Sequence, residues 1–189
     1  MKNAMFALAC ATACTWASAQ QFDNATQRLT DQRAAMQGLS MLDGIWRGPA
    51  FTVLPDGKKI ELTQTERVGA FLDGSVKVIE GRGYDSAGKV AFNAFGTVAF
   101  DPATKTYTLH SHAQSYYGIH PLQTTEDGFI WEMPAGPTKI RFTTSIKAGI
   151  WSEVGDRIMP DGRTVRFFEM KLQRIGDTTW PAGDAVPPK

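Results

Sequence analysis

Two carboxylates and one arginine lie on neighbouring stretches in which polar and apolar residues alternate. Glu66 stands in the run 58–71, and Glu80 and Arg82 stand in the run 75–85. Each shares its parity with apolar residues, so alternation places all three on faces that a sheet would bury. A buried charge must be paired, hydrogen-bonded or neutralised. The cluster predicts either a pocket, where Arg82 binds a ligand carboxylate or Glu80 acts as a base of raised pKa, or a structural Glu–Arg pair inside a barrel.

Other side chains extend this candidate site. Asn93 and Ser111 are neutral polar partners, with ordinary ladder or surface roles as the alternative. Glu153 belongs either to the rim of the pocket or to an exterior ion pair. Four large apolar residues from later strands would form a ligand-contacting wall, or would simply fill the core as in many small barrels. The predicted ligand-binding residues are Glu66, Glu80, Arg82, Asn93, Ser111, Trp131, Phe142, Glu153, Phe168 and Met170.

A pair of histidines, His110 and His112, has the one metal-like spacing in the chain. On a strand their Cα atoms would lie about 6.6 Å apart on one face, near enough to share a zinc ion. The apolar residues of that strand stand at the odd-numbered positions, so the inner face belongs to them. Both imidazoles would then point outward, and no metal site is predicted. The chain has no G-x-S-x-G motif, and Gly81-x-Gly83 precedes no helix, which argues against a nucleotide loop.

The elements that position these residues are short strands separated by tight turns. Turn pairs such as Asp73-Gly74 and Asp161-Gly162 recur from Gly44 onward. No helical pattern interrupts the strands, and closing such a meander removes its exposed edges. We predict an all-β, antiparallel up-and-down β-barrel of about ten strands with a short N-terminal helix. The predicted strands are 45–54, 58–71, 75–85, 89–101, 106–116, about 119–125, 128–133, 138–147, 150–159 and 163–175.

The N-terminal residues have the pattern of a secretory signal peptide. Lys2 precedes an apolar run, and Ala17-Ser18-Ala19 fits a cleavage site. Cleavage there removes Cys10 and Cys14, which leaves no thiol for a disulfide or a metal. A lipoprotein is the alternative, although neither cysteine has a leucine three residues before it. The predicted organisation is 1–19 signal peptide, 20–41 helical segment, 42–176 barrel and 177–189 irregular tail, in a periplasmic or secreted protein.

The charge of the chain is balanced, with 20 basic residues, 19 acidic residues and a formal net charge of +1. There is no run of lysine and arginine that would indicate binding to nucleic acid. No later segment has the length and apolarity of a transmembrane helix. The sequence leaves the oligomeric state open.

A resemblance to a known fold rests on the segments Leu42-Asp43-Gly44-Ile45-Trp46-Arg47-Gly48, Glu80-Gly81-Arg82-Gly83-Tyr84, Ser111-His112-Ala113-Gln114 and Phe168-Glu169-Met170. Together they resemble a lipocalin-like (calycin) family of uncharacterised exported bacterial proteins. The resemblance implies that Gly44, Trp46 and Arg174 close one end of the barrel. The opening is also similar to haem-binding nitrobindin barrels, which use a histidine from the C-terminal part. Residues 128–189 contain no histidine, so no haem and no other cofactor is predicted.

The function predicted from these features is binding of a small hydrophobic or amphipathic molecule in the open end of an exported lipocalin-like barrel. Binding is favoured over catalysis. One alternative is a hydrolase or isomerase that uses an interior glutamate as general base. The other is a structural barrel filled by its own side chains, with no ligand.

Overall fold

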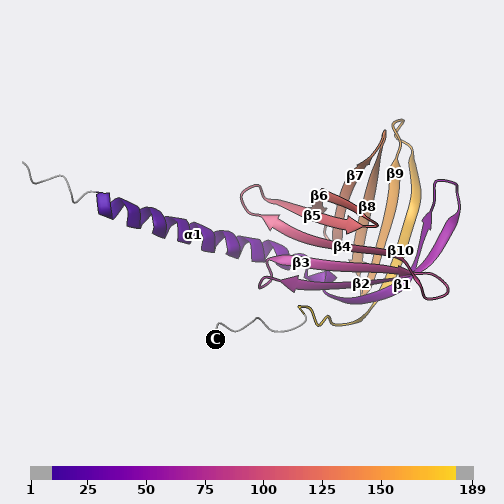
Figure 1. The fold of residues 1–189 in the computed structure, drawn as a ribbon, viewed down its shortest axis with the longest axis horizontal. Coiled ribbons are helices and arrows are strands. Elements are labelled where there is room, and N and C mark those ends of the chain that lie inside the picture. The colour runs from indigo at the N-terminus through magenta and orange to yellow at the C-terminus, as the bar shows by residue number, and fades with distance from the viewer. Residues whose placement is uncertain (1–9, 182–189) are drawn as a thin grey trace, which may run out of the picture.

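The computed structural model describes residues 10–181, with side chains from residue 24 onward, as a long helix followed by a closed antiparallel barrel (Figure 1). Within this part of the chain each strand pairs with its neighbours in sequence, and β1 pairs with β10 to close the wall. The predicted all-β barrel is confirmed. The elements are α1 (Cys10–Gln37), η1 (Ser40–Leu42), β1 (Gly44–Val53), β2 (Lys59–Phe71), β3 (Val76–Tyr84), β4 (Val90–Asp101), β5 (Thr106–Ala113), β6 (Tyr116–Thr124), β7 (Gly128–Ala135), β8 (Thr138–Lys147), β9 (Ile150–Ile158) and β10 (Thr164–Gly176).

Local turn chemistry explains why the strands end where they do. Gly57 and Gly162 both adopt a φ of +84°, a left-handed conformation that side chains with a Cβ rarely take. The aspartate before each glycine accepts a backbone N–H two residues ahead, at 3.0 Å in both turns. These Asx-type bonds hold the hairpins β1–β2 and β9–β10.

The core lies at one end of the barrel, where the helical segment plugs the opening. Met36, Leu39 and Leu42 are at most 1% exposed and pack with inward-facing strand residues such as Val68 and Leu172. The hydroxyl of Tyr107 donates to the carbonyl of Ala35 at 2.8 Å, which fixes the end of α1 on the barrel. This end is therefore sealed, and a ligand inside the barrel would have to occupy its other part.

Trp46 lies at the centre of the sealed end. Its indole Nε1 donates to the carbonyl of Leu42 at 2.8 Å, and its ring packs edge-on against Trp151 with centroids 5.7 Å apart. The guanidinium of Arg174, the Cα partner of Trp46 across the β1–β10 ladder, donates to the carbonyl of Asp43. The indole N–H is thus hydrogen-bonded within the sealed end. Trp46 therefore lies outside the part of the barrel that could take a ligand.

Lys77 is the one lysine placed on the inner face of β3. It is 3% exposed, and its ammonium lies 2.6 Å from both carboxylate oxygens of Asp43. Asp43 directly precedes β1 and Lys77 lies on β3, so the ion pair connects the helical segment that seals the barrel to the barrel wall. A buried ammonium requires such a partner, because removing an unpaired charge from water costs several kcal/mol.

The beginning of α1 and the described segment after β10 lie outside the wall. Helix α1 extends away from the barrel (Figure 1) and includes the last part of the predicted signal peptide, while residues 1–9 lie outside the described part. After β10 the chain crosses the outer face of β2, where Trp180 packs against Phe71 with ring centroids 6.0 Å apart. No helix within residues 10–181 has the length and apolarity needed to cross a membrane.

Candidate functional site

The inner wall above the sealed end carries a row of aromatic rings. Trp131 on β7 stacks on Phe142 on β8, with centroids 4.4 Å apart and planes 13° from parallel. Phe142 also meets Phe168 of β10 edge-on at 6.0 Å, across Gly155. A Cβ at position 155 would lie 2.9 Å from both phenylalanine side chains, so glycine there makes room for this row. The row runs across four neighbouring strands.

Two glutamates face the same interior. Glu66 stands on the inner row of β2 with Gln64 and Val68, opposite Trp46 in the β1–β2 ladder. Gln64 Nε2 donates to Glu66 Oε1 at 2.7 Å. Glu153 stands on the inner row of β9 and accepts a hydrogen bond from the hydroxyl of Thr144 at 2.5 Å. In the described part of the chain neither carboxyl group takes part in an ion pair within 4.0 Å.

Burial dominates the electrostatics of this pair. Burial raises the pKa of Glu66 to about 8, the hydrogen bond from Gln64 opposes the rise, and the nearby charges of Glu153 and Glu80 add to it. Burial likewise raises the pKa of Glu153, against the hydrogen bond from Thr144. At neutral pH Glu66 is mainly a neutral acid, which both donates and accepts hydrogen bonds.

Four residues of this inner wall are intermediate between buried and exposed. They are Glu153, Trp131, Phe142 and Phe168, which all point inward. The inner wall therefore combines an aromatic row with a carboxyl group, above the sealed end.

A third polar group on the inner wall is His120 of β6. It is 7% exposed, and its ring lies 5.0 Å from that of Trp131. Burial lowers the pKa of its imidazole, so it is neutral at pH 7. A Cβ at Gly118 would lie 2.2 Å from its Nε2, which shows that the missing side chain at position 118 leaves space for the imidazole.

Glu80 and Arg82 do not belong to this interior, and the alternation-based prediction for them is wrong. They point to the outer face of β3, where the Arg82 guanidinium binds the Glu80 carboxylate at 2.5 Å. Their side chains are 28% and 49% exposed. The inner row of β3 is instead Lys77, Ile79, Gly81 and Gly83. Because this inner row contains a lysine and two glycines, the alternation of apolar residues along the sequence does not identify it as the inner face.

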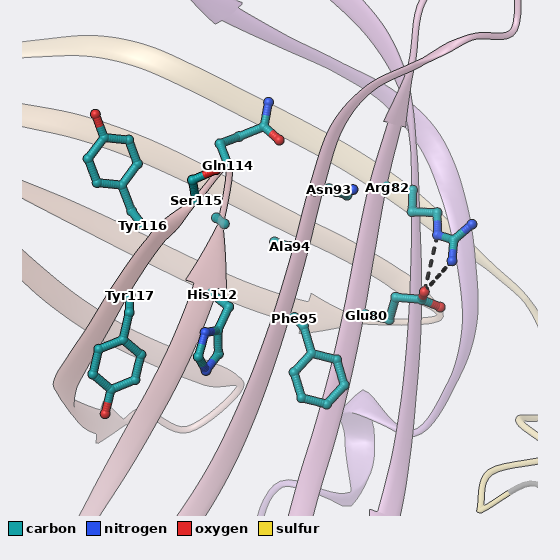
Figure 2. Close-up of a pocket in the computed structure, with 11 residues that line it drawn as sticks. Glu80, Arg82, Asn93, Ala94, Phe95, His112, Gln114, Ser115, Tyr116 and Tyr117 are labelled. Atoms are coloured by element: carbon teal, nitrogen blue, oxygen red, sulfur yellow. Dashed lines mark hydrogen bonds and ion pairs between the residues drawn. The ribbon is translucent and has the colours of Figure 1, made fainter.

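Asn93 also points outward, and with Glu80 and Arg82 it lines an outer pocket of about 410 Å³ on β3 to β6 (Figure 2). Phe95, His112 and Tyr117 lie side by side across three strands on the floor of this pocket. A second pocket, of about 540 Å³, lies where β1, β2 and β10 meet the loop after β3. The outer pocket collects three of the predicted site residues, but outside the barrel.

The remaining predicted residues divide by face. Ser111 points inward on β5 and is partly exposed, and Met170 points inward on β10 and is 3% exposed. His110 and His112 point outward. Among the described side chains, no three His, Cys, Asp or Glu residues are close enough to hold a metal ion.

The residues do not fit the haem that the nitrobindin resemblance implies. The C-terminal part of the barrel offers no histidine, and two of the chain's three histidines point outward. The third, His120, lies buried against Trp131.

Four interior residues were not among the predicted ligand-binding residues: Gln64, Gly81, His120 and Thr144. Gln64 and Thr144 hold the two glutamates, and a Cβ at Gly81 would lie 2.6 Å from Glu66 Oε1. One signal was present: Gln64 and Glu66 share the parity of Leu62 and Val68. The roles of Gly81, His120 and Thr144 become visible only when the register between neighbouring strands is known.

Comparison with known proteins supports the fold alone. The chain is similar to the crystal structure of Rv2717c from M. tuberculosis, with a TM-score of 0.57 and 16% identity, over 75% of this chain and 97% of that chain. No protein-family model and no curated protein matches the sequence.

Proposed function

We propose that this chain is an exported, lipocalin-like barrel that binds a small, largely apolar molecule in its lumen. One observation carries the proposal: Glu153 and the aromatic row of Trp131, Phe142 and Phe168 face the same interior, and none of these four residues is fully buried. Apolar walls with a few placed polar groups are the usual composition of small-molecule sites. The signal-peptide pattern that ends at Ala19 supports the exported location.

The aromatic row favours a ligand with a substantial apolar part. Stacked and edge-on rings present flat hydrocarbon surface, and covering such surface yields roughly 25 cal/mol for each Å² removed from water. Trp131 and Phe142 form the stacked centre of the row, so the apolar part of the ligand would lie against them.

The two glutamates favour a neutral or cationic polar group over a carboxylate. Burial raises the pKa of both Glu66 and Glu153, and the same surroundings would disfavour the ionised form of a ligand carboxylate or force it to take up a proton. A hydroxyl or amine can accept from or donate to both groups. Arg82, which the sequence offered as an anion-binding group, points away from the lumen.

Tryptophan-fluorescence titration tests the proposal with two probes of equal chain length, dodecanol and dodecanoic acid. We expect dodecanol to change the emission and to bind more tightly than the acid. Glu66→Gln and Glu153→Gln should weaken dodecanol binding by about tenfold, the value of one hydrogen bond. Glu80→Gln, on the outer face, is the matched control and should bind like the wild type. If neither probe alters the emission, lumen binding is wrong.

A second function, general-base catalysis in the lumen, is favoured by one observation. Burial brings the pKa of Glu66 to about 8, close to the pH at which a general base works best. The chain would then be a hydrolase or an isomerase. With ester and ketone substrate panels, Glu66→Gln should abolish any turnover while the melting temperature stays within a few degrees. Turnover that survives in Glu66→Gln would exclude this role.

A further inference from the structure

Strand β6 has a free edge. It pairs with β5 along seven residue pairs, from Tyr107↔Leu122 to Ala113↔Tyr116. On its other side it pairs with β7 through only three residues, Leu122 to Thr124. In the described part of the chain, the segment Tyr116–Pro121 therefore has no strand partner on that side, and its outward backbone groups make no other backbone hydrogen bond.

This edge lacks the features that normally keep an exposed strand unpaired. Natural edges carry charged side chains, prolines or bulges. From Gln114 to Thr125 the sequence contains no Asp, Glu, Lys or Arg, and Pro121 stands only at the end of the free segment. Tyr116, Tyr117 and Ile119 are 81%, 59% and 55% exposed. An uncharged, apolar edge of this kind is a template for strand addition.

The facing edge of β7 is built differently. It carries Glu132, whose carboxylate binds Lys139 at 2.8 Å and Arg141 at 2.7 Å, and Pro134, which has no N–H to donate. Charge and proline are the usual means of protecting an edge. Of the two strands that separate here, only β6 is open to a partner.

The apolar surface continues beyond the edge strand. Phe95, His112 and Tyr117 are lateral neighbours on β4, β5 and β6, and the rings of His112 and Tyr117 are 5.0 Å apart (Figure 2). Phe95 is 44% exposed. A partner that pairs with β6 would therefore also find an aromatic surface beside it, and contiguous exposed apolar surface marks interaction sites.

We propose that the free edge of β6, Tyr116–Pro121, pairs antiparallel with the same edge of a second copy of this chain, forming a two-fold dimer with one continuous sheet. An antiparallel strand pair about a two-fold axis needs only one edge that is complementary to itself. The β6 edge meets this need because it brings no charge opposite its own copy. The net charge of +1 also opposes association only weakly.

In this dimer, with the two-fold axis at Gly118, Tyr117 of each copy lies opposite Ile119 of the other copy, both on the outer face of β6. Cross-strand pairs of aromatic and β-branched side chains stabilise a ladder, and the backbone hydrogen bonds supply the rest. The inward-facing His120 stays in the barrel wall, since strand addition uses the edge and leaves both faces unchanged.

Sedimentation equilibrium on the full chain tests the dimer at concentrations from about 5 to about 500 µM, which bracket a transient interface. We expect a monomer–dimer equilibrium. Ile119→Lys removes the apolar partner of Tyr117 in both cross-strand pairs and places the two lysines diagonally across the two-fold axis, so it should raise the dissociation constant at least about tenfold. Ile175→Lys is the matched control, because Ile175 is 50% exposed on β10, and it should associate like the wild type.

Hydrogen exchange on the wild-type chain provides a test that needs no variant. Backbone amides in 116–120 should gain protection as the concentration rises, while those in 164–167 of β10 should not change. A chain that stays monomeric over the whole range overturns the proposal. So does a dimer in which Ile175→Lys weakens association as much as Ile119→Lys, or in which 116–120 gains no protection.

Discussion

Glu66 and Gly81 face each other across the β2–β3 ladder, and the carboxyl group of Glu66 occupies the space that a side chain at position 81 would fill. A Cβ there would lie 2.6 Å from Oε1 and 2.8 Å from Oε2 of Glu66. Gly83, two residues on, leaves the same kind of space for Oε1 of Gln64. The glycines of β3 thus let two polar side chains lie flat on the inner wall.

Gly81→Ala should lower the free energy of unfolding by about 1–3 kcal/mol, the usual cost of overpacking. The methyl group forces the Glu66 carboxyl away from its hydrogen bond with Gln64. Urea denaturation measures the change. Gly176→Ala is the control, because nothing lies within 4 Å of the Cβ built there and its φ is not left-handed. Equal losses in both variants would show that the carboxyl group does not fill the space at position 81.

Stability should fall as the pH rises from about 4.5 to about 8, and Glu66 should account for part of the fall. Its folded pKa of about 8 lies above the ordinary 4.5, so the folded state keeps a proton that the unfolded state loses. The contribution is complete below pH 4.5 and is lost on passing pH 8, with a slope of at most about 1.4 kcal/mol per pH unit. Glu153 acts in the same direction.

Denaturant unfolding at a series of pH values separates the two glutamates. Glu66→Gln should flatten the dependence between pH 4.5 and 8, leaving the part due to Glu153. Glu80→Gln should leave the dependence nearly as in the wild type, because Glu80 lies on the outer face with Arg82. A wild-type protein whose stability rises over this range would contradict the raised pKa of Glu66.

Trp46→Ala should lower the free energy of unfolding by about 3–5 kcal/mol, the range for removing a large buried side chain. Trp46 is 1% exposed, and its indole both packs on Trp151 and donates to Leu42. Thermal or chemical denaturation checks the value, with Phe95→Ala, at an exposed position, as the control. If the Trp46 variant unfolds like the wild type, the sealed end does not hold the barrel together.

Removing the two partners of the Asp43–Lys77 ion pair should have unequal effects. Asp43→Ala leaves a buried ammonium without a partner and should cost about 3 kcal/mol, the lower part of the range for a broken buried pair. Lys77→Met removes the buried charge and leaves Asp43, whose side chain is 33% exposed, to water, so it should be nearly neutral. Denaturation of both variants tests the order, and a more damaging Lys77→Met would contradict it.

Turns and the sealed end are the parts of this fold that local sequence predicts well. Asp56-Gly57 and Asp161-Gly162 encode their own turn geometry, so the strand boundaries follow within a few residues. Trp46 at the head of the strand series marks the place where the barrel closes. These turn pairs and this tryptophan can be recognised from a few consecutive residues, without knowing how the strands pair.

The inner face of β3 could not be predicted because its residues gain their roles from other strands. Lys77 is buried only because Asp43 pairs with it, and Gly81 matters only because Glu66 lies above it. Val78, which shares the parity of Glu80 and Arg82, points with them to the outer face. Glu66 and Glu153 were identified singly, whereas their shared lumen appears only once β2 and β9 are curled into one barrel.

Native mass spectrometry of the protein purified from its own host tests lumen binding most directly. We predict a population heavier than the bare chain by the mass of one small molecule, which gas-phase activation releases. Trp131→Ala should reduce that population, because it removes the ring stacked on Phe142, while Glu80→Gln should preserve it. A spectrum that contains only the bare chain, in gentle conditions and in every preparation, would contradict the proposed function.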